Sequence, residues 1–189
     1  MLYLGIDQSL RHTGVALIDS NGNPKAYHAI IVKSLKGSER LAHIQKELQL
    51  FLSNFDPVVA GSIEGPSIGS THRGFDLGEI SGVLKADFFT RGIPLAVVSP
   101  TTLKKFVTGK GQASKEQMLY SVNRKYQLSL TDDNLADALG LACFSLLLHT
   151  FPKIQISVAR HEIETIKQFL VPKKRKLRKA PIKQNLNNL

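Results

Sequence analysis

The hydrophobic pattern at the start of the chain predicts a β-hairpin. Residues 2–6 (Leu-Tyr-Leu-Gly-Ile) and residues 14–18 (Gly-Val-Ala-Leu-Ile) are apolar runs of strand length, and a polar, turn-rich segment separates them. Asp7 directly follows the first run, at the point where a strand leaves the core. A carboxylate in this position costs desolvation energy and needs a partner. We infer that this partner is a divalent cation shared with acidic residues from later in the chain.

The later pattern predicts alternating strands and helices, and this order favours an α/β protein with a mixed sheet covered by helices. Ser99 before Pro100 is expected to cap one helix, and Ser114 with Gln117 is expected to form a capping box at another. In order, the pattern predicts a strand at 26–32, a helix from Ser38 that Asp56-Pro57 stops, a buried strand at 58–63 and a loop at 67–75. It then predicts a helix at 76–90, a strand at 94–98, a helix from Ser99 to Phe106, a loop at 108–114, and helices after Ser114 and within 129–150.

Composition and charge divide the chain into a globular body, residues 1–152, and a basic extension, residues 153–189. Of the 189 residues, 42% are hydrophobic and 21% are charged, which is typical of a folded domain. The net charge is +10, and residues 151–189 contain ten Lys and Arg against two Glu. We expect the extension to be partly helical, then flexible, and to bind a polyanion, with nucleic acid favoured over a membrane surface. A tail that only keeps the protein in solution is the alternative.

The single cysteine indicates a protein without disulfides. Cys143 lies in an apolar helical pattern, so we expect it in the core of a protein from a reducing compartment, the cytoplasm. Asp7 interrupts the N-terminal apolar run, which argues against a signal peptide. No apolar stretch reaches the roughly 18 residues that a membrane span needs. We therefore expect no membrane partner.

Acidic residues at the ends of predicted elements form a candidate metal site. Asp7 and Glu64 each end a predicted strand, and the ends of neighbouring strands are where sites gather in α/β sheets. Asp133 and Asp137 are four positions apart, so one helical turn places both on the same face, and Asn134 shares that face. Hard oxygen ligands of this kind suit Mg²⁺ or Mn²⁺.

Each of these acids also has an ordinary explanation. An Asp after a strand is commonly a turn residue, and Asp132 and Asp133 at a helix start are favourable for the helix dipole. Asp137, however, lies inside the helix beside Ala136 and Ala138, where a surface ion pair explains it poorly. The combined placement of the acids favours a functional site.

Three short motifs resemble the RuvC family of Holliday junction resolvases, and in particular the compact versions carried by bacteriophages. They are Leu4-Gly5-Ile6-Asp7 followed by Thr13-Gly14, then Ile63-Glu64-Gly65, and then Asn134-Leu135-Ala136-Asp137-Ala138-Leu139. The likeness covers roughly residues 1–150. It implies a ribonuclease H-like fold, with a five-stranded mixed sheet and helices on both faces. It also implies a cytoplasmic homodimer in a bacterial or phage-infected cell that nicks two opposed strands of a four-way DNA junction, leaving 5′-phosphate and 3′-hydroxyl ends, without a nucleotide cofactor.

The resemblance implies that Asp7, Glu64 and Asp137 hold two Mg²⁺ ions, for which Mn²⁺ can substitute. The family places a fourth ligand three residues before the last Asp, which is Asn134 in this chain. Either Asp133 takes that place or Asn134 binds through its amide oxygen. In our mechanistic hypothesis Asp7 bridges the ions, and Lys115 either supports the charge on the phosphate or is an ordinary solvated lysine.

The resemblance also implies a DNA-binding surface, since Lys104, Lys110 and Lys115 fall where the family's basic residues approach DNA. The family's aromatic wedge after the Glu is missing, because Pro66-Ser67-Ile68 stands there. Either Phe75 substitutes for it or the selectivity for junctions is loose. His12, His72 and Arg73 either contact phosphates or are polar loop residues. The predicted DNA contacts are Lys104, Lys105, Lys110, Lys115, Arg73, Phe75, Lys173, Lys174, Arg175 and Lys176.

Three other functions remain open from the sequence. The first is a nuclease with broader specificity for flaps and forks, and the second is a junction-binding protein without catalysis. The third is an actin-like ATPase or sugar kinase, which shares the strand–Asp–turn–Gly–strand opening but needs two lobes and a glycine-rich phosphate loop. Gly78 and Gly82 make the helix at 76–90 a candidate for the dimer surface.

Overall fold

A five-stranded mixed sheet forms the centre of the computed structural model, which describes residues 1–55, 57–65 and 71–171. The sheet order is β3-β2-β1-β4-β5. The hairpin of β1 and β2 is antiparallel, as is the pairing of β2 with β3, whereas β4 runs parallel to both β1 and β5. The strands are β1 (Leu2–Asp7), β2 (His12–Asp19), β3 (Pro24–Ile31), β4 (Val58–Glu64) and β5 (Leu95–Val98). The predicted mixed sheet is confirmed.

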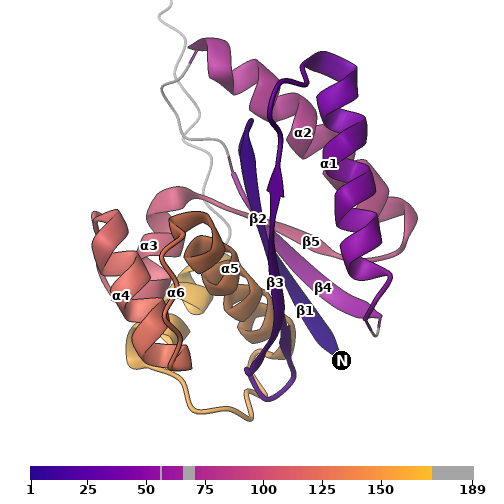
Figure 1. Ribbon diagram of the computed structural model, residues 1–189. Helices are drawn as coiled ribbons and strands as arrows, with labels where there is room; N and C mark the ends of the chain where they lie inside the picture. The colour runs from indigo at the N-terminus through magenta and orange to yellow at the C-terminus, as the bar shows by residue number, and fades with distance from the viewer. Residues whose placement is uncertain (56, 66–70, 172–189) are drawn as a thin grey trace, which may run out of the picture.

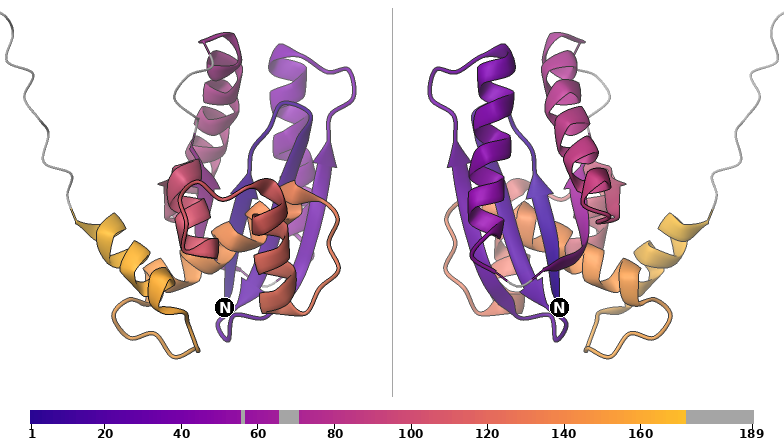
Figure 2. Two further views of the ribbon diagram at one scale, coloured as in Figure 1. Left: turned by 90° about the vertical axis from the view of Figure 1, so that its left-hand side faces the viewer. Right: turned by 90° about the vertical axis from the view of Figure 1, so that its right-hand side faces the viewer.

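Helices cover both faces of the sheet (Figures 1 and 2). One face packs against α1 (Gly37–Leu52) and α2 (Thr71–Thr90), and the other packs against α5 (Asp133–Thr150). Around α5 lie α3 (Pro100–Thr108), α4 (Lys115–Tyr126) and α6 (Arg160–Leu170). Two apolar cores, one on each side of the sheet, result from this layering.

Alternation along the central strands decides which core each side chain joins. In β1, Tyr3 belongs to the core under α5, whereas Leu4 and Ile6 belong to the core under α1 and α2. Because successive side chains of a strand point to opposite faces, Asp7 has the same orientation as Tyr3 and therefore lies on the α5 side. By the same alternation in β4, Glu64 shares the side of Ala60, which is also under α5.

Two glycines let α5 lie directly on the hairpin. A Cβ atom built on Gly5 would lie 1.9 Å from the carbonyl oxygen of Ala138, and one on Gly14 would lie 2.3 Å from that of Asn134. No side chain larger than hydrogen fits at either position without displacing the helix. This close approach brings the first turns of α5 to the end of β1.

Most predicted element starts are confirmed to within two residues, and that of α2 differs. Ser99 caps α3, accepting a hydrogen bond from the backbone N–H of Thr102 at 3.2 Å, and Ser114 forms the expected capping box at α4. The prediction that the loop runs on to Phe75 is wrong, since α2 begins at Thr71. The last long helix begins at Asp133, with Asp132 as its N-cap.

The segment after α5 packs back onto the body. Ile166 of α6 is buried in the core under α5, and Phe169 contacts Phe144 edge to face, with ring centroids 5.0 Å apart. Lys125 of α4 forms an ion pair with Glu162, which is 5% exposed, and Cys143 is buried as predicted. Among the described residues, no helix is both long and apolar enough to cross a membrane.

Candidate active site

The predicted acidic residues meet where β1 and β4 end and α5 begins. Asp7 is the last residue of β1 and Glu64 is the last residue of β4, and these strands are parallel neighbours. The same edge of the sheet therefore holds both carboxyl groups. Asp133 and Asp137 lie in the first turns of α5, and the glycines of the hairpin allow these turns to pack closely against it.

Asp7 is the buried centre of this cluster. It is 6% exposed, and its carboxyl group lies beside that of Glu64. Burial raises the pKa of Asp7 well above its usual range, and the charges of Glu64, Asp137 and Asp133 raise it further. Burial likewise raises the pKa of Glu64. Three carboxylates around a fourth that is desolvated require positive charge if all of them are to ionise.

Asp137 has the same environment. Its pKa is raised to about 7, first by burial and then by the charges of Glu64 and Asp133. Its Oδ1 atom is buried and has no hydrogen-bond partner among the described residues. A buried acceptor of this kind is costly unless a ligand satisfies it.

Two lysines supply positive charge at the cluster. Lys115, at the start of α4, forms an ion pair with Asp133, and this hydrogen bond lowers the pKa of Asp133 and raises that of Lys115. Lys104 of α3 lies close enough that its charge lowers the pKa values of Glu64 and Asp137. The structure thus brings these two predicted DNA contacts to the acids.

The other predicted DNA contacts are placed differently. The Nζ of Lys105 donates to the Oε1 of Gln168 at 2.8 Å, on the side of α6, and Lys110 is exposed in the turn after α3. Phe75 is 81% exposed on α2. The side chains of His72 and Arg73, the segment Pro66-Ser67-Ile68, and the tail residues Lys173, Lys174, Arg175 and Lys176 lie outside the described residues.

The donor set fits a hard divalent cation that would gather the carboxylates. Within the described residues, no three His, Cys, Asp or Glu side chains are already arranged to hold a metal ion. Asp133 is instead paired with Lys115. Carboxylate oxygens are the ligands that Mg²⁺ and Mn²⁺ prefer, and the buried Oδ1 of Asp137 has no partner among the described residues.

A hydrogen-bond network that the sequence did not reveal supports the start of α5. The Nδ1 of His12 lies 3.1 Å from the Nδ2 of Asn134, and its Nε2 lies 3.1 Å from the Oδ2 of Asp132. The Asn134 amide nitrogen also lies 3.3 Å from the Oδ1 of Asp132. His12 begins β2, so its expected role as a loop residue is wrong. The helix-start motif pointed to Asp132 only as a cap, and nothing in the sequence linked it to His12.

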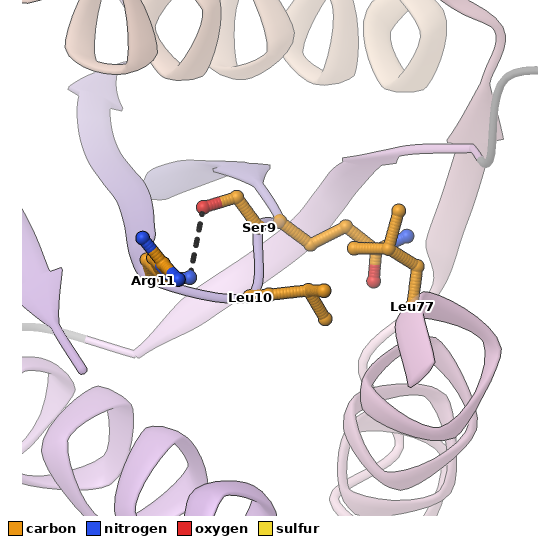
Figure 3. Close-up of a pocket in the computed structure, with 5 residues that line it drawn as sticks. Ser9, Leu10, Arg11 and Leu77 are labelled. Atoms are coloured by element: carbon orange, nitrogen blue, oxygen red, sulfur yellow. Dashed lines mark hydrogen bonds between the residues drawn. The ribbon is translucent and has the colours of Figure 1, made fainter. Parts of the chain in front are cut away.

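Gln8, next to Asp7, is a second residue that the sequence analysis missed. Its Nε2 donates to the backbone carbonyl of Glu64 at 2.7 Å, and so ties the ends of β1 and β4 together. It lines a pocket of about 440 Å³ with Ser9, Leu10, Arg11 and Leu77 (Figure 3). The one feature of the sequence that could have indicated Gln8 is its position directly after Asp7.

Comparison with known protein families identifies the family of this chain. The family model of the crossover junction endodeoxyribonuclease RuvC matches residues 3–144, which include all four acids. The chain belongs to the RuvC family. This membership excludes the actin-like ATPase or sugar kinase interpretation and confirms the family resemblance.

Curated RuvC proteins from several bacteria align with most of the chain. The crossover junction endodeoxyribonuclease RuvC of Hyphomonas neptunium is 30% identical over 153 residues, which cover 79% of this chain and 91% of that protein. That of Pelodictyon phaeoclathratiforme is 28% identical over 162 residues, which cover 78% and 80% of the two chains.

Solved RuvC structures share the fold. The structure of Thermus thermophilus RuvC superposes with a TM-score of 0.65 at 23% identity and covers 76% of this chain and 92% of its own. The same RuvC in complex with a Holliday junction substrate gives a TM-score of 0.67, with coverage of 76% and 91%. The predicted ribonuclease H-like fold is therefore confirmed.

Proposed function

We propose that the protein is a metal-dependent endonuclease that resolves four-way DNA junctions by paired nicks. The observation that carries this proposal is the buried carboxyl group of Asp7 on β1, surrounded by Glu64 of β4 and by Asp133 and Asp137 of α5. A structural role does not account for so many like charges at one edge of a sheet. Family membership supports the same activity.

The residues that would hold the metal ions are Asp7, Glu64, Asp137 and Asp133. Asp133 is favoured over Asn134 because a carboxylate carries the negative charge that a divalent cation attracts, whereas an amide oxygen is neutral. The amide nitrogen of Asn134 contacts His12 and Asp132, which leaves its amide oxygen as the alternative ligand. Mg²⁺ is the ion that we propose, and Mn²⁺ the substitute, since both prefer oxygen ligands.

Held by these carboxylates, two divalent ions would supply activation of a water molecule and neutralisation of the charge on the departing 3′ oxygen. The chain itself contributes position and charge. Asp7, at the centre of the sheet edge, orients the cluster toward the DNA strand. Lys104 and Lys115 lie beside the acids, where their charge balances the phosphate that enters the site. The products carry 5′-phosphate and 3′-hydroxyl ends, which a ligase can seal.

Two copies of the chain are required to cut two opposed strands, and α2 offers a surface for their contact. Phe75 and Phe89 are 81% and 86% exposed on this helix. Between them, a Cβ built on Gly78 or Gly82 would meet no atom of the described residues within 4 Å. Large apolar side chains exposed around small ones form a surface that another helix can cover. Phe89→Glu should therefore shift the protein from dimer to monomer in light-scattering measurements.

The test of the proposed function is a cleavage assay with the Asp7→Asn variant. A mobile four-way junction, a flap and a plain duplex are compared in Mg²⁺ and in Mn²⁺. We expect the wild type to cut the junction into ligatable products, and Asp7→Asn to bind it without cutting. Asp19→Asn is the matched control, because Asp19 also ends a strand but only caps its own turn.

Each other outcome identifies a rival function. Cutting of flaps as fast as junctions indicates a broader nuclease, and tight binding without cutting in either metal indicates a junction-binding protein. If Asp7→Asn nicks junctions at the wild-type rate, the metal-site assignment is wrong.

A further inference from the structure

A pocket beside the candidate active site is not used by the mechanism. It has a volume of about 440 Å³ and lies between the turn that joins β1 to β2 and the helix α2. Ser9, Leu10 and Arg11 come from the turn, and Leu77 comes from α2 (Figure 3). Gln8 completes the lining, and its amide bonds to the backbone carbonyl of Glu64, so the pocket adjoins the strand ends that carry Asp7 and Glu64.

Gln8 presents a hydrogen-bond acceptor that no described residue satisfies. The side chain is 7% exposed, and its Nε2 donates to the carbonyl oxygen of Glu64 at 2.7 Å. That bond fixes the orientation of the amide, because only the nitrogen can donate to a carbonyl. The Oε1 is buried and has no partner among the described residues. A buried acceptor held in one orientation is a site for a ligand N–H.

The other lining groups limit the chemistry of that ligand. Ser9 is occupied, since its Oγ donates to the carbonyl of His12 and accepts from the N–H of His12, both at 2.8 Å. Leu10 and Leu77 are half-buried and supply apolar walls, and Arg11 is exposed at the rim. Two apolar walls, one fixed acceptor and a cation at the rim match a flat heterocycle with an N–H edge attached to a phosphate.

We propose that this pocket takes the base of a nucleotide adjacent to the cleaved phosphate, and that Gln8 Oε1 accepts a hydrogen bond from that base. The inference rests on the proposed function, because it requires that branched DNA bind at the acidic cluster. Stacking is interrupted at a branch point, so a base there leaves the helix at lower cost than one in continuous duplex. Leu10 and Leu77 then contact the faces of the base, and Arg11 contacts the backbone beside it. Gln8 is thus a specificity-determining residue.

The test compares the base preference of the wild type with that of Gln8→Met. Methionine keeps the length of the side chain but removes the acceptor. Junctions that carry each of the four bases at each position around the cut are cleaved in parallel. We expect the wild type to prefer one or two bases at a single position by about 3- to 10-fold, the effect of one hydrogen bond. Gln8→Met should lose this preference at that position, whatever its overall rate.

A second measurement reports the position of the base without cleavage. The Asp7→Asn protein is added to junctions with 2-aminopurine at the same position, and we expect fluorescence to rise as the base unstacks. Substitution of Leu10 by Ala in the same protein should reduce the rise. Gln49→Met is the matched control, because Gln49 on α1 donates to Asp87 on α2 at 3.0 Å, away from the pocket.

The outcomes separate this inference from the nuclease assignment. Junction cutting with the same base preference in the wild type and Gln8→Met overturns the base pocket and leaves the nuclease standing. Unchanged 2-aminopurine fluorescence on binding overturns it as well. If the wild type neither binds nor cuts junctions, both proposals are wrong.

Discussion

The Nδ1 of His12 lies 3.1 Å from the amide nitrogen of Asn134, although the two residues are 122 positions apart in the chain. The other ring nitrogen of His12 pairs with Asp132, the N-cap of α5. Together these contacts attach the beginning of β2 to the beginning of α5. These contacts therefore orient the helix turn that carries Asp133 and Asp137, as hydrogen-bond partners behind metal ligands usually do.

His12→Ala should weaken metal binding without abolishing it. Loss of a group that orients the ligands typically costs about 10- to 100-fold in affinity. We expect a higher Mg²⁺ concentration for half-maximal cleavage and a smaller stabilisation of the protein by Mg²⁺ in thermal unfolding. His43→Ala is the control, since His43 lies on α1, on the other face of the sheet, and its ring hydrogen bonds to the backbone carbonyl of Ile31. Equal metal dependence in both variants would mean that the network is only structural.

Asp133→Asn and Asn134→Ala should differ in their effect on metal binding. Because the charge of Asp133 reaches Asp7 and Asp137, we expect Asp133→Asn to weaken Mn²⁺ binding measured by calorimetry by tenfold or more, roughly the effect of a lost charged ligand. Asn134→Ala keeps every carboxylate and should bind Mn²⁺ more tightly than Asp133→Asn does. The reverse order would identify Asn134 as the fourth ligand.

The crowded carboxyl groups predict a pH-dependent stability in the absence of metal. The folded protein raises the pKa of Asp137 from its ordinary value of 3.8 to about 7. Between pH 4 and pH 7 the folded protein thus keeps a proton that the unfolded chain has released, so stability falls as pH rises through this window. Denaturant unfolding in EDTA should show this slope, and Asp137→Asn should flatten it. A slope that is the same in the variant would exclude Asp137 as its source.

Gly5→Ala should separate α5 from the sheet. The added Cβ would lie 1.9 Å from the carbonyl oxygen of Ala138, which is backbone and cannot turn away. Overpacking of this kind typically lowers the free energy of unfolding by about 1–3 kcal/mol. Gly78→Ala is the control, because a Cβ there meets nothing within 4 Å in the described part of the chain and should stabilise α2 by roughly 0.5–1 kcal/mol. Urea unfolding measures both, and equal stabilities would contradict the close packing.

Deletion of residues 172–189, which lie outside the described part of the chain, should flatten the salt dependence of DNA binding. The deleted segment contains seven Lys and Arg and no acidic residue. Each phosphate contact releases counterions, so losing these charges lowers the slope of log affinity against log salt concentration. Replacing Lys173, Lys174, Arg175 and Lys176 by Gln keeps the length of the tail and should give a partial reduction. An unchanged slope would show that the tail does not contact DNA.

Local sequence patterns were sufficient for much of the fold. The apolar runs at residues 2–6 and 14–18, with a turn-rich segment between them, predicted the hairpin, and Ser99 and Ser114 predicted the starts of their helices. These features depend on side-chain direction and hydrogen bonds within a few residues, which the local sequence encodes. The start of α2 was missed because glycines and a proline precede it, and such residues normally indicate a loop.

In the candidate site as well, local sequence patterns determined some features and tertiary packing determined the others. Strand ends and helical spacing identified Asp7, Glu64, Asp133 and Asp137 from the sequence alone, since each position follows from its own element. Their burial, the pairing of Asp133 with Lys115, and the contacts of His12 and Gln8 were decided only by the tertiary structure. These relationships join segments that are far apart in the chain. They depend on how closely α5 packs against β1, which Gly5 and Gly14 permit and which no local pattern encodes.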